Sequence, residues 1–333
     1  MTPARAPART GLIAVLVALV SALFFTMTYV LNRASAVGGG DWMWAAVLRY
    51  FITLPMLLPL MRWQGGMAPV WRAIRAHPRA WLGCAGIGFV GFYALLTYAA
   101  SSGPSWLVAG SFQFTVVAGM LCAPLLYRDH RRYIPRAALA VGAVIIAGVL
   151  LLQFGHAEGP LDRAGWIALA CVLGAAVLYP LGNRLLLLHL ERTGERLNAT
   201  QRVFGMTLAS QPFWLMLGLI AAVRVGLPGI GETLLAAGVA LFAGVIATIL
   251  FFHATGMVQD NPMALGAVEA MQAAELLFSV LLGALFLREA WPQGGALLGA
   301  ALVAVGIIAF AWLVAKQRPA VATPQQLRTD RGA

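Results

Sequence analysis

Charged residues are scarce in this chain. Only 11% of its 333 residues are Asp, Glu, Lys or Arg, while 61% are hydrophobic. A soluble domain has about 25% charged and about 45–50% apolar residues. The mean hydropathy of +0.82 also indicates an unusually apolar chain. This composition excludes a soluble globular enzyme, a disordered chain and a fibrous repeat, and it predicts an all-α polytopic membrane protein.

Residue patterns for cofactors and catalysis are also missing. The cysteines, Cys84, Cys122 and Cys171, lie singly in apolar runs, which is typical of small buried side chains and not of a disulfide framework or a zinc site. The five histidines are scattered without metal-ligand spacing. A phosphate-binding loop, H-E-x-x-H and G-x-S-x-G are all absent. We therefore expect no cofactor, no metal and no enzymatic activity.

Long apolar runs occupy most of the sequence. A membrane helix needs about 20 mostly apolar residues, and ten runs qualify. They lie at 12–31, 42–61, 81–101, 104–127, 136–154, 165–188, 197–223, 233–256, 262–287 and 292–315.

Basic residues are unevenly distributed among the loops. Most of the 23 lie on the side of the two termini, while Arg33, Arg163, Arg224 and Arg288 lie on the other. The positive-inside rule then predicts a multi-pass protein of the bacterial inner membrane with both termini cytoplasmic. The net charge of +11 is therefore interpreted as topology and not as nucleic-acid binding, with membrane lipids as the partners of some loop arginines.

Several short signatures occur twice, in the same order. Each is weak alone, but the spacing between partners grows slowly, as small insertions between two homologous halves would cause. We predict a first repeat at 12–155 and a second at 156–315, flanked by cytoplasmic tails at 1–11 and 316–333. The paired signatures are Asn32-Arg33 with Asn183-Arg184, Arg49 with Arg202, Pro104 with Pro262, and Arg128-Asp129 with Arg288-Glu289.

Five spans in each half would insert the second half upside down relative to the first. Such inverted-topology repeats are common in secondary transporters, whose substrate sites lie near the bilayer midplane between the halves. The sequence therefore predicts alternating access to a small-molecule site.

The ten spans, the repeat and the Arg-acid pair after each fourth span resemble the drug/metabolite transporter superfamily of the EamA type, over about residues 12–315. The stretches Tyr179–Arg184 and Glu269–Glu275 resemble its multidrug-resistance efflux branch. The resemblance implies efflux of small organic molecules, drugs or metabolites. An uncoupled facilitator or importer of the same fold stays open, as does a membrane-embedded enzyme acting on lipid-linked substrates.

Two acids lie well inside the ninth predicted span. Glu269, Gln272 and Glu275 are spaced to share one helix face. A carboxylate costs at least about 2.5–3.5 kcal/mol at the centre of a bilayer, so it needs a partner or a role. We predict that Glu275 and Glu269 carry protons, because desolvation disfavours the charged form of a carboxylate. The alternative is a structural ion pair with Arg49 or Arg202.

Other polar residues inside spans are candidates for contact with substrate. Gln113 occupies the position in the fourth span that corresponds to the acids of the ninth. Each candidate has a structural alternative: an inter-helix hydrogen bond, snorkelling to the headgroups, or an interface anchor. The predicted substrate-binding residues are Gln272, Gln113, Tyr98, Tyr179, His253 and Arg49.

Small residues recur four apart in the fifth and tenth spans, as Ala138 and Gly142, and as Gly295 and Gly299. This spacing lets helices approach closely. It predicts a seam that serves either packing within the chain or a homodimer.

Overall fold

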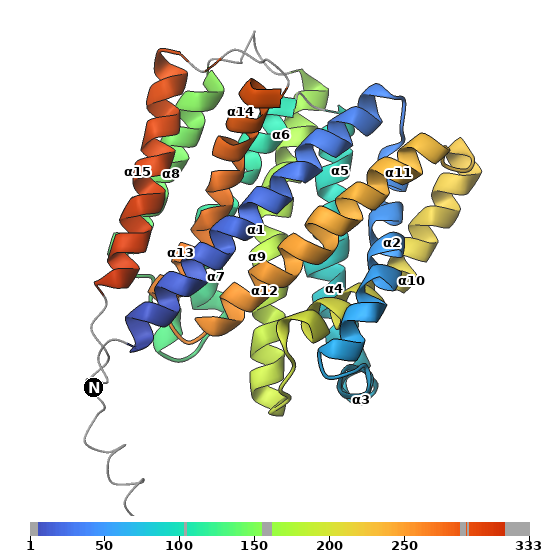
Figure 1. The fold of residues 1–333 in the computed structure, drawn as a ribbon, viewed down its shortest axis with the longest axis horizontal. Helices are drawn as coiled ribbons and strands as arrows, with labels where there is room; N and C mark the ends of the chain where they lie inside the picture. The colour runs from blue at the N-terminus through green and yellow to red at the C-terminus, as the bar shows by residue number, and fades with distance from the viewer. Residues whose placement is uncertain (1–5, 103–104, 155–161, 287–290, 292, 317–333) are drawn as a thin grey trace, which may run out of the picture.

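The computed structural model describes residues 6–102, 105–154, 162–286, 291 and 293–316, and these form a bundle of helices (Figure 1). No strand occurs among the described residues. The first expected half is built of eight α-helices, with a π-helical segment at Gly86–Gly91 and a 3₁₀ turn at His130–Arg132. These helices are α1 (Ala6–Val37), α2 (Trp42–Trp63), α3 (Ala68–Ala76), α4 (Pro78–Ala85), α5 (Phe92–Ser102), α6 (Ser105–Phe112), α7 (Thr115–Leu126) and α8 (Arg136–Phe154).

The second expected half begins after residues 155–161, which lie outside the described residues together with the predicted boundary at 155. It contains a π-helical segment at Ala240–Ala247 and a 3₁₀ turn at Met271–Ala273. Its helices are α9 (Arg163–Thr193), α10 (Ala199–Val225), α11 (Ile230–Val239), α12 (Thr248–Met257), α13 (Pro262–Ala270), α14 (Ala274–Phe286) and α15 (Gly295–Ala315).

The expectation of a polytopic helical membrane protein is confirmed. Within the described residues, nine helical stretches are long and apolar enough to cross a membrane, and Gly110–Leu126 is a shorter apolar helix. The shorter one falls in the fourth predicted span and contains the interruption between α6 and α7 at Gln113 and Phe114. Helix α1 begins at Ala6, earlier than predicted, and the amphipathic helix α3 lies in a segment predicted as a loop.

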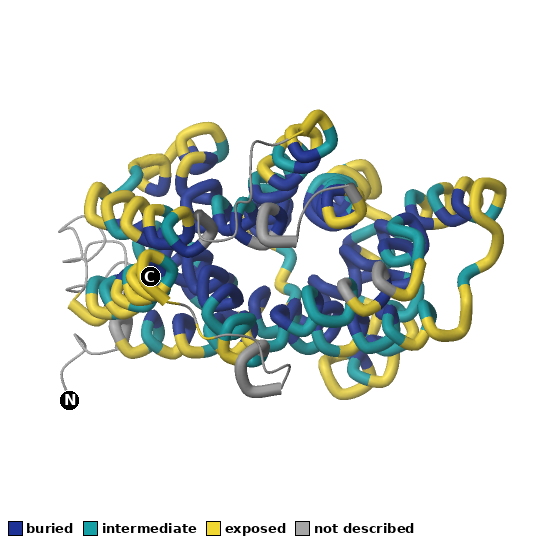
Figure 2. The backbone as a smooth tube through the Cα atoms, turned by 90° about the horizontal axis from the view of Figure 1, so that it is seen from above, coloured by how far each residue is buried: buried dark blue, intermediate teal, exposed yellow. Residues whose placement is uncertain are grey.

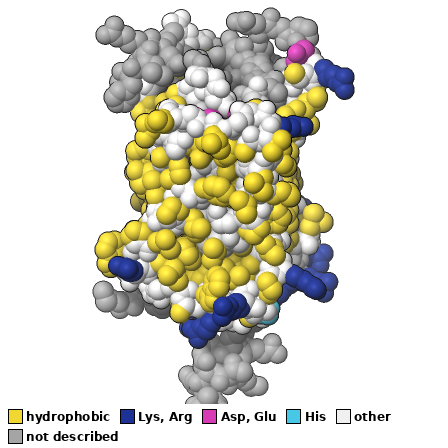
Figure 3. Space-filling view, turned by 90° about the vertical axis from the view of Figure 1, so that its right-hand side faces the viewer, with side chains coloured by type: hydrophobic (Ala, Val, Ile, Leu, Met, Phe, Trp, Pro, Cys, Tyr) yellow, Lys and Arg dark blue, Asp and Glu magenta, His cyan; other side chains and the backbone are white. Residues whose placement is uncertain are grey.

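The surface of the bundle suits a lipid environment. Buried residues face the centre of the bundle, and exposed ones face its periphery (Figure 2). Many of the exposed side chains are large and apolar, including Leu16, Leu125 and Val223. Figure 3 shows this apolar surface around the middle of the molecule, with most of the visible Lys and Arg side chains at the lower end.

That lower end, called the basic end below, is where α1 begins and α15 ends. The two helices meet there, because a Cβ on Gly11 of α1 would lie 2.5 Å from a methyl carbon of Val314 of α15. Helix α9 ends at the basic end as well, whereas α1 ends at the opposite one (Figure 1).

The two expected halves are interlocked. Helix α1 packs on α11, α12, α13 and α14, and α9 packs in the corresponding way on α4, α5, α6 and α7. Helix α2 packs on α10, and α8 on α15. The π-helical segments occur at corresponding places, in the third span of each half. The contacts between the halves therefore recur in pairs, as those of two related units would.

Helices α8 and α15 approach each other most closely at two glycines. A Cβ added to Gly148 would lie 2.7 Å from the carbonyl oxygen of Gly299. Gly299 thus belongs to a seam within the chain, while Gly295, one turn earlier, has open space around it. Gly142 packs instead against α7, where its Cβ would lie 2.8 Å from Val117.

We predict that Gly299→Leu destabilises the protein by at least about 1–3 kcal/mol, because the side chain would meet the backbone of α8 and push the two helices apart. Gly295→Leu is the matched control, because its side chain would project into open space. Thermal unfolding of the detergent-purified variants measures both. Equal melting temperatures for the two variants would contradict the close approach.

Candidate functional site

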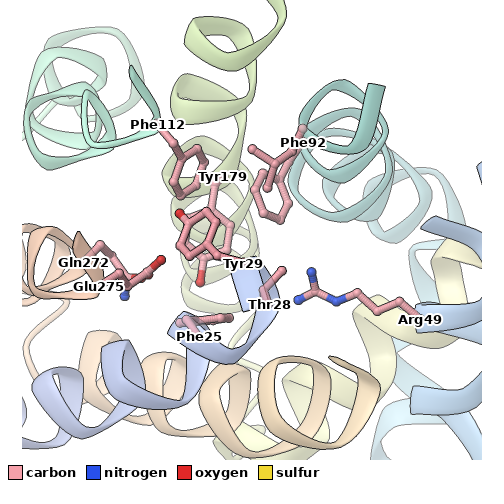
Figure 4. Close-up of a pocket in the computed structure, with 10 residues that line it drawn as sticks. Phe25, Thr28, Tyr29, Arg49, Phe92, Phe112, Tyr179, Gln272 and Glu275 are labelled. Atoms are coloured by element: carbon pink, nitrogen blue, oxygen red, sulfur yellow. The ribbon is translucent and has the colours of Figure 1, made fainter. Parts of the chain in front are cut away.

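A small cavity lies at the centre of the bundle, between the two halves (Figure 4). Its volume of about 30 Å³ has room for one or two water molecules. Helices α1, α2, α5 and α6 line it from the first half, and α9, the 3₁₀ turn and α14 from the second. The lining residues are Phe25, Thr28, Tyr29, Arg49, Phe92, Leu96, Phe112, Tyr179, Gln272 and Glu275.

Two interrupted helices shape this cavity. Helix α6 ends at Phe112, and the turn that follows has 3₁₀-type hydrogen bonds, with the Gln113 amide donating to the Gly110 carbonyl at 3.1 Å. In the second half, α13 gives way to a 3₁₀ turn that contains Gln272. Such mid-helix 3₁₀ stretches often mark functional hinges. Gln113 and Gln272 thus lie at corresponding breaks.

Glu275 is buried in the wall of the cavity. Its side chain is in the first turn of α14. The residue is 3% exposed, and among the described residues no Lys, Arg or His nitrogen lies within 4 Å of its carboxylate. The hydroxyl of Tyr29 lies within hydrogen-bonding reach. Glu275 is therefore a buried carboxylate without an ion-pair partner in the described part of the chain.

Arg49 lies across the cavity from Glu275 (Figure 4). Its guanidinium carbon is 4.0 Å from the centre of the Tyr93 ring and 5.4 Å from that of Tyr50. Asn32, a predicted repeat signature, donates a hydrogen bond of 3.3 Å to the Tyr93 hydroxyl. The aromatic rings hold the Arg49 cation by cation–π attraction, so a guanidinium and a carboxyl group lie on opposite walls of the cavity.

Several polar atoms around the cavity have no hydrogen-bond partner in the described protein. They are Thr28 Oγ1, Arg49 Nε, Tyr179 Oη and Gln272 Nε2. Buried polar atoms are nearly always hydrogen-bonded, to protein, water or ligand. This set therefore offers donors and acceptors to a molecule that enters the cavity.

The remaining walls are aromatic, and Tyr179 is at their centre. Its ring centre lies 4.7 Å from that of Phe92 and 5.2 Å from that of Phe251. Phe25 meets it edge-on at 6.2 Å. Aromatic walls with a few polar groups are typical of sites for small organic molecules.

Glu269, the other acid of the ninth predicted span, is held by an ion pair. Its two carboxylate oxygens accept hydrogen bonds of 2.8 Å from Nε and Nη2 of Arg184. Both residues are almost fully buried, and Gly119 leaves the space that the carboxylate fills. The partner is Arg184 and not Arg49 or Arg202, the two arginines that the sequence suggested.

Three of the predicted substrate-binding residues do not line the central cavity. Gln113 is buried at the break after α6. Tyr98 lies on α5, partly exposed, with its ring edge-on to Trp42 at 5.4 Å. His253 is exposed on α12 and lines a different, open cavity at the basic end.

The remaining repeat signatures lie apart from the central cavity. Asn183 is buried beside Arg184 on α9. Pro262 opens α13, where the side chain of Asn261 accepts a hydrogen bond from the Ala264 amide at 3.1 Å. Arg202 lies at the open cavity. Pro104 and the side chain of Arg33 fall outside the described residues.

A cluster of charges ties the two halves together at the basic end. Arg131 donates hydrogen bonds to Asp129, and its Nη1 is 2.7 Å from a carboxylate oxygen of Glu191 in α9. Asp260, between α12 and α13, is 3.5 Å away. The side-chain hydrogen bond from Arg131 lowers the pKa of Asp129 to about 2.

Five of the cavity residues, Phe25, Thr28, Phe92, Leu96 and Phe112, were not among those predicted from sequence. The apolar ones carry no signal that distinguishes a cavity wall from an ordinary core. Thr28 is a polar residue in an apolar run, which is the signal that would have found it.

The chain was compared with known proteins. A family model described as "Putative multidrug resistance efflux transporter" matches residues 12–316. The uncharacterized protein YjlA of Bacillus subtilis is 38% identical over 315 residues, which cover 92% of this chain and 96% of YjlA. An uncharacterized 42.1 kDa protein of Shouchella clausii is 38% identical over 268 residues, or 79% of this chain and 70% of that protein.

One solved crystal structure superimposes with a TM-score of 0.67 over 90% of this chain and 97% of that one. At 17% sequence identity, this likeness concerns the fold alone.

The two acids of the ninth predicted span are expected to differ in their contribution to stability. Glu269→Gln leaves the Arg184 cation buried without its partner and should cost about 3–5 kcal/mol. Glu275→Gln breaks no ion pair of the described residues and should change the melting temperature little. Thermal unfolding of purified variants measures both. Recovery of stability in the double variant Arg184→Gln, Glu269→Gln would confirm the pair, and equal destabilisation by both single changes would contradict it.

The Arg131 cluster should stabilise the protein equally at pH 5 and pH 8. The folded-state pKa of Asp129, about 2, is below its ordinary value of 3.8. The stabilisation is therefore fully present above about pH 4 and is lost as the pH falls towards 2. Asp129→Asn should lower stability by no more than about 1 kcal/mol, because Asp129 is partly exposed. Thermal unfolding from pH 3 to 8 checks this, and a deficit that changes between pH 5 and 8 would contradict it.

Proposed function

Because this chain belongs to the family of multidrug resistance efflux transporters matched over residues 12–316, we propose that it is a secondary transporter that exports small organic molecules, drugs or metabolites, in exchange for protons. The observation that carries this proposal is Glu275, a buried carboxylate in the central cavity with no ion-pair partner among the described residues.

Glu275 is proposed as the proton carrier because its two protonation states suit two different partners. A protonated carboxyl is compatible with an apolar, water-poor cavity, whereas the ionised form needs a cation or a donor. A substrate with a positive or hydrogen-bonding group would fill that need and compete with the proton. Such competition for one carboxylate produces antiport.

We propose that the other acid, Glu269, is structural, although the sequence suggested it as a second proton carrier. Its bidentate bond to Arg184 leaves neither oxygen free for exchange. Substrate contacts are assigned to Gln272, Tyr179 and Arg49, whose partnerless atoms surround the cavity. The aromatic residues around Tyr179 would hold the organic part of the substrate.

The proposed transport mechanism is alternating access of an inverted-topology repeat. The pairwise contacts between halves and the matched helix interruptions support it. A cavity of about 30 Å³ is far below the roughly 300–1,000 Å³ of an ordinary ligand pocket, so the lining helices must separate to admit a substrate. The Arg131 cluster would have to open when access changes at the basic end.

We place the protein in the bacterial inner membrane with both termini cytoplasmic. The basic end carries most of the basic side chains visible in Figure 3, and the positive-inside rule assigns that end to the cytoplasm. The seam between α8 and α15 lies within one chain, so it does not argue for a homodimer.

The test uses the purified protein in liposomes that contain a pH-sensitive dye. Under an imposed pH gradient, a panel of organic cations, amino acids and neutral metabolites is added to wild type and Glu275→Gln. Wild type should release protons when a substrate is added, and the variant should lose at least about nine tenths of this response. Glu232→Gln, which changes an acid outside the cavity, is the matched control and should behave as wild type.

Equal substrate flux in wild type and Glu275→Gln, without proton release in either, would favour an uncoupled facilitator. The carboxylate would then be a structural partner of Tyr29. Proton release that is unchanged in the variant would overturn the assignment of Glu275.

A further inference from the structure

A second, larger cavity opens at the basic end. Its volume is about 700 Å³, within the range of small-molecule pockets. Helices α9, α10 and α12 and the loop between α9 and α10 form its walls, and it shares no lining residue with the central cavity. It is called the inner cavity below.

Arg202 is the distinctive residue of the inner cavity. It is 5% exposed, and no carboxylate of the described residues lies within 4 Å of its guanidinium. Its Nε has no hydrogen-bond partner, and Nη2 donates to the carbonyl oxygen of Phe252. Two other buried arginines, Arg131 and Arg184, differ from Arg202 in that each forms an ion pair with a carboxylate. A buried cation without a counter-ion is costly, so its retention at a cavity wall calls for an anionic partner.

The surroundings of Arg202 favour an anion. It lies in the first turn of α10, where the helix dipole adds positive potential. Asn198 caps that helix from the wall of the same cavity. Gly256 gives the guanidinium its space, because a Cβ there would overlap it.

The acids that line the inner cavity do not neutralise Arg202. Glu191 is bonded to Arg131. Glu195 has a buried oxygen without a partner, but it lies beyond ion-pair distance of Arg202. That oxygen is available as an acceptor for a hydroxyl or ammonium group elsewhere on a ligand.

We propose that the inner cavity is a second ligand site, in which Arg202 binds the carboxylate or phosphate group of a small organic molecule. The anion makes charge-assisted hydrogen bonds with the guanidinium and takes the place of the Phe252 carbonyl as its partner. The same chemistry occurs on soluble metabolites and on phospholipid headgroups of the inner leaflet, and the experiment below separates the two.

The inner cavity is connected to the central one through two neighbouring aromatic residues. Phe252 provides the carbonyl that Arg202 holds, and the ring of Phe251 stacks on Tyr179 in the central cavity. An anion that releases the Phe252 carbonyl therefore acts on the segment that supports the wall of the central cavity. Occupancy of one site is coupled to the shape of the other by this route.

The binding test uses the full chain purified in detergent. Inorganic phosphate and acetate are titrated against thermal unfolding, with chloride at the same ionic strength as the reference. Wild type should be stabilised by one of these anions, and Arg202→Gln should bind it about 10- to 100-fold more weakly, as expected for loss of a hydrogen bond to a charged group. Arg192→Gln, which removes an exposed arginine outside the cavity lining, should bind as wild type does.

Gly256→Ala is a second variant, because it displaces the guanidinium without removing its charge. It should weaken anion binding as Arg202→Gln does. If Arg202→Gln does not fold, anion binding by Gly256→Ala tests the role of Arg202. Arg202→Lys should bind with intermediate affinity, because Lys keeps the charge but not the planar fork.

The lipid source is tested in nanodiscs of phosphatidylglycerol and of phosphatidylcholine. Stabilisation by phosphatidylglycerol that depends on Arg202, with no response to phosphate or acetate, assigns the site to a headgroup. A response to the soluble anions assigns it to a soluble ligand. The proposal is overturned if no anion or anionic lipid stabilises wild type, or if Arg192→Gln loses binding as Arg202→Gln does. These readouts need no proton flux, so they stand whether or not Glu275 carries protons.

Discussion

The low polarity of the membrane interior is the constraint on which this structure depends. A charge placed there needs a partner, and the chain meets this need in different ways at different sites. Glu269 and Arg184 satisfy each other with two hydrogen bonds of 2.8 Å, and both are inaccessible to solvent. Such a pair holds α13 to α9, and therefore one wall of the cavity to another, without offering any group for exchange. Glu275, six residues later, has the Tyr29 hydroxyl within hydrogen-bonding reach and forms no ion pair with the described residues. One span thus carries an ion-paired carboxylate and a carboxylate that forms no ion pair with the described residues, and we proposed different roles for them on this ground.

The interruptions of the helices explain how the two acids on one span come to have such different surroundings. An unbroken α-helix would place Glu269, Gln272 and Glu275 along one continuous face. The 3₁₀ turn at Met271–Ala273 divides that face, so Glu269 belongs to α13 and points at Arg184, while Glu275 begins α14 and lines the cavity. The break between α6 and α7 does the same in the first half and brings Phe112 to the cavity. Backbone freed from regular hydrogen bonding is tolerated at this depth because other helices surround it.

The sequence was sufficient to predict the fold class and the family, because apolar runs and repeated signatures are local patterns. Four of the candidates it singled out, Glu275, Gln272, Tyr179 and Arg49, line the central cavity, since polar groups inside apolar runs are rare enough to stand out. The sequence could not predict which charged residues form ion pairs. Nothing local indicates that Glu269 meets Arg184, which is 85 residues away along the chain. The sequence also predicted that Glu269, Gln272 and Glu275 share one helix face. The 3₁₀ turn at Met271–Ala273 divides that face, and it contains no proline or glycine that would have indicated the break. Aromatic walls such as Phe92 and Phe112 resemble any other core residues until tertiary structure places them.

Arg49 and Arg202, which the sequence predicts to be corresponding residues of the two halves, have different surroundings in the structure. Arg49 lies against the rings of Tyr93 and Tyr50 at the small central cavity, whereas Arg202 lies at the wall of the larger inner cavity and near the ring of Phe252. Two equivalent units that pack identically would give their arginines equivalent surroundings. For the proposed repeat, this difference corresponds to a difference in conformation between the two halves. If the halves exchanged conformations, Arg49 would come to line an open cavity on the opposite side and Arg202 would be enclosed. This exchange is what the proposed alternating access of an inverted-topology repeat requires.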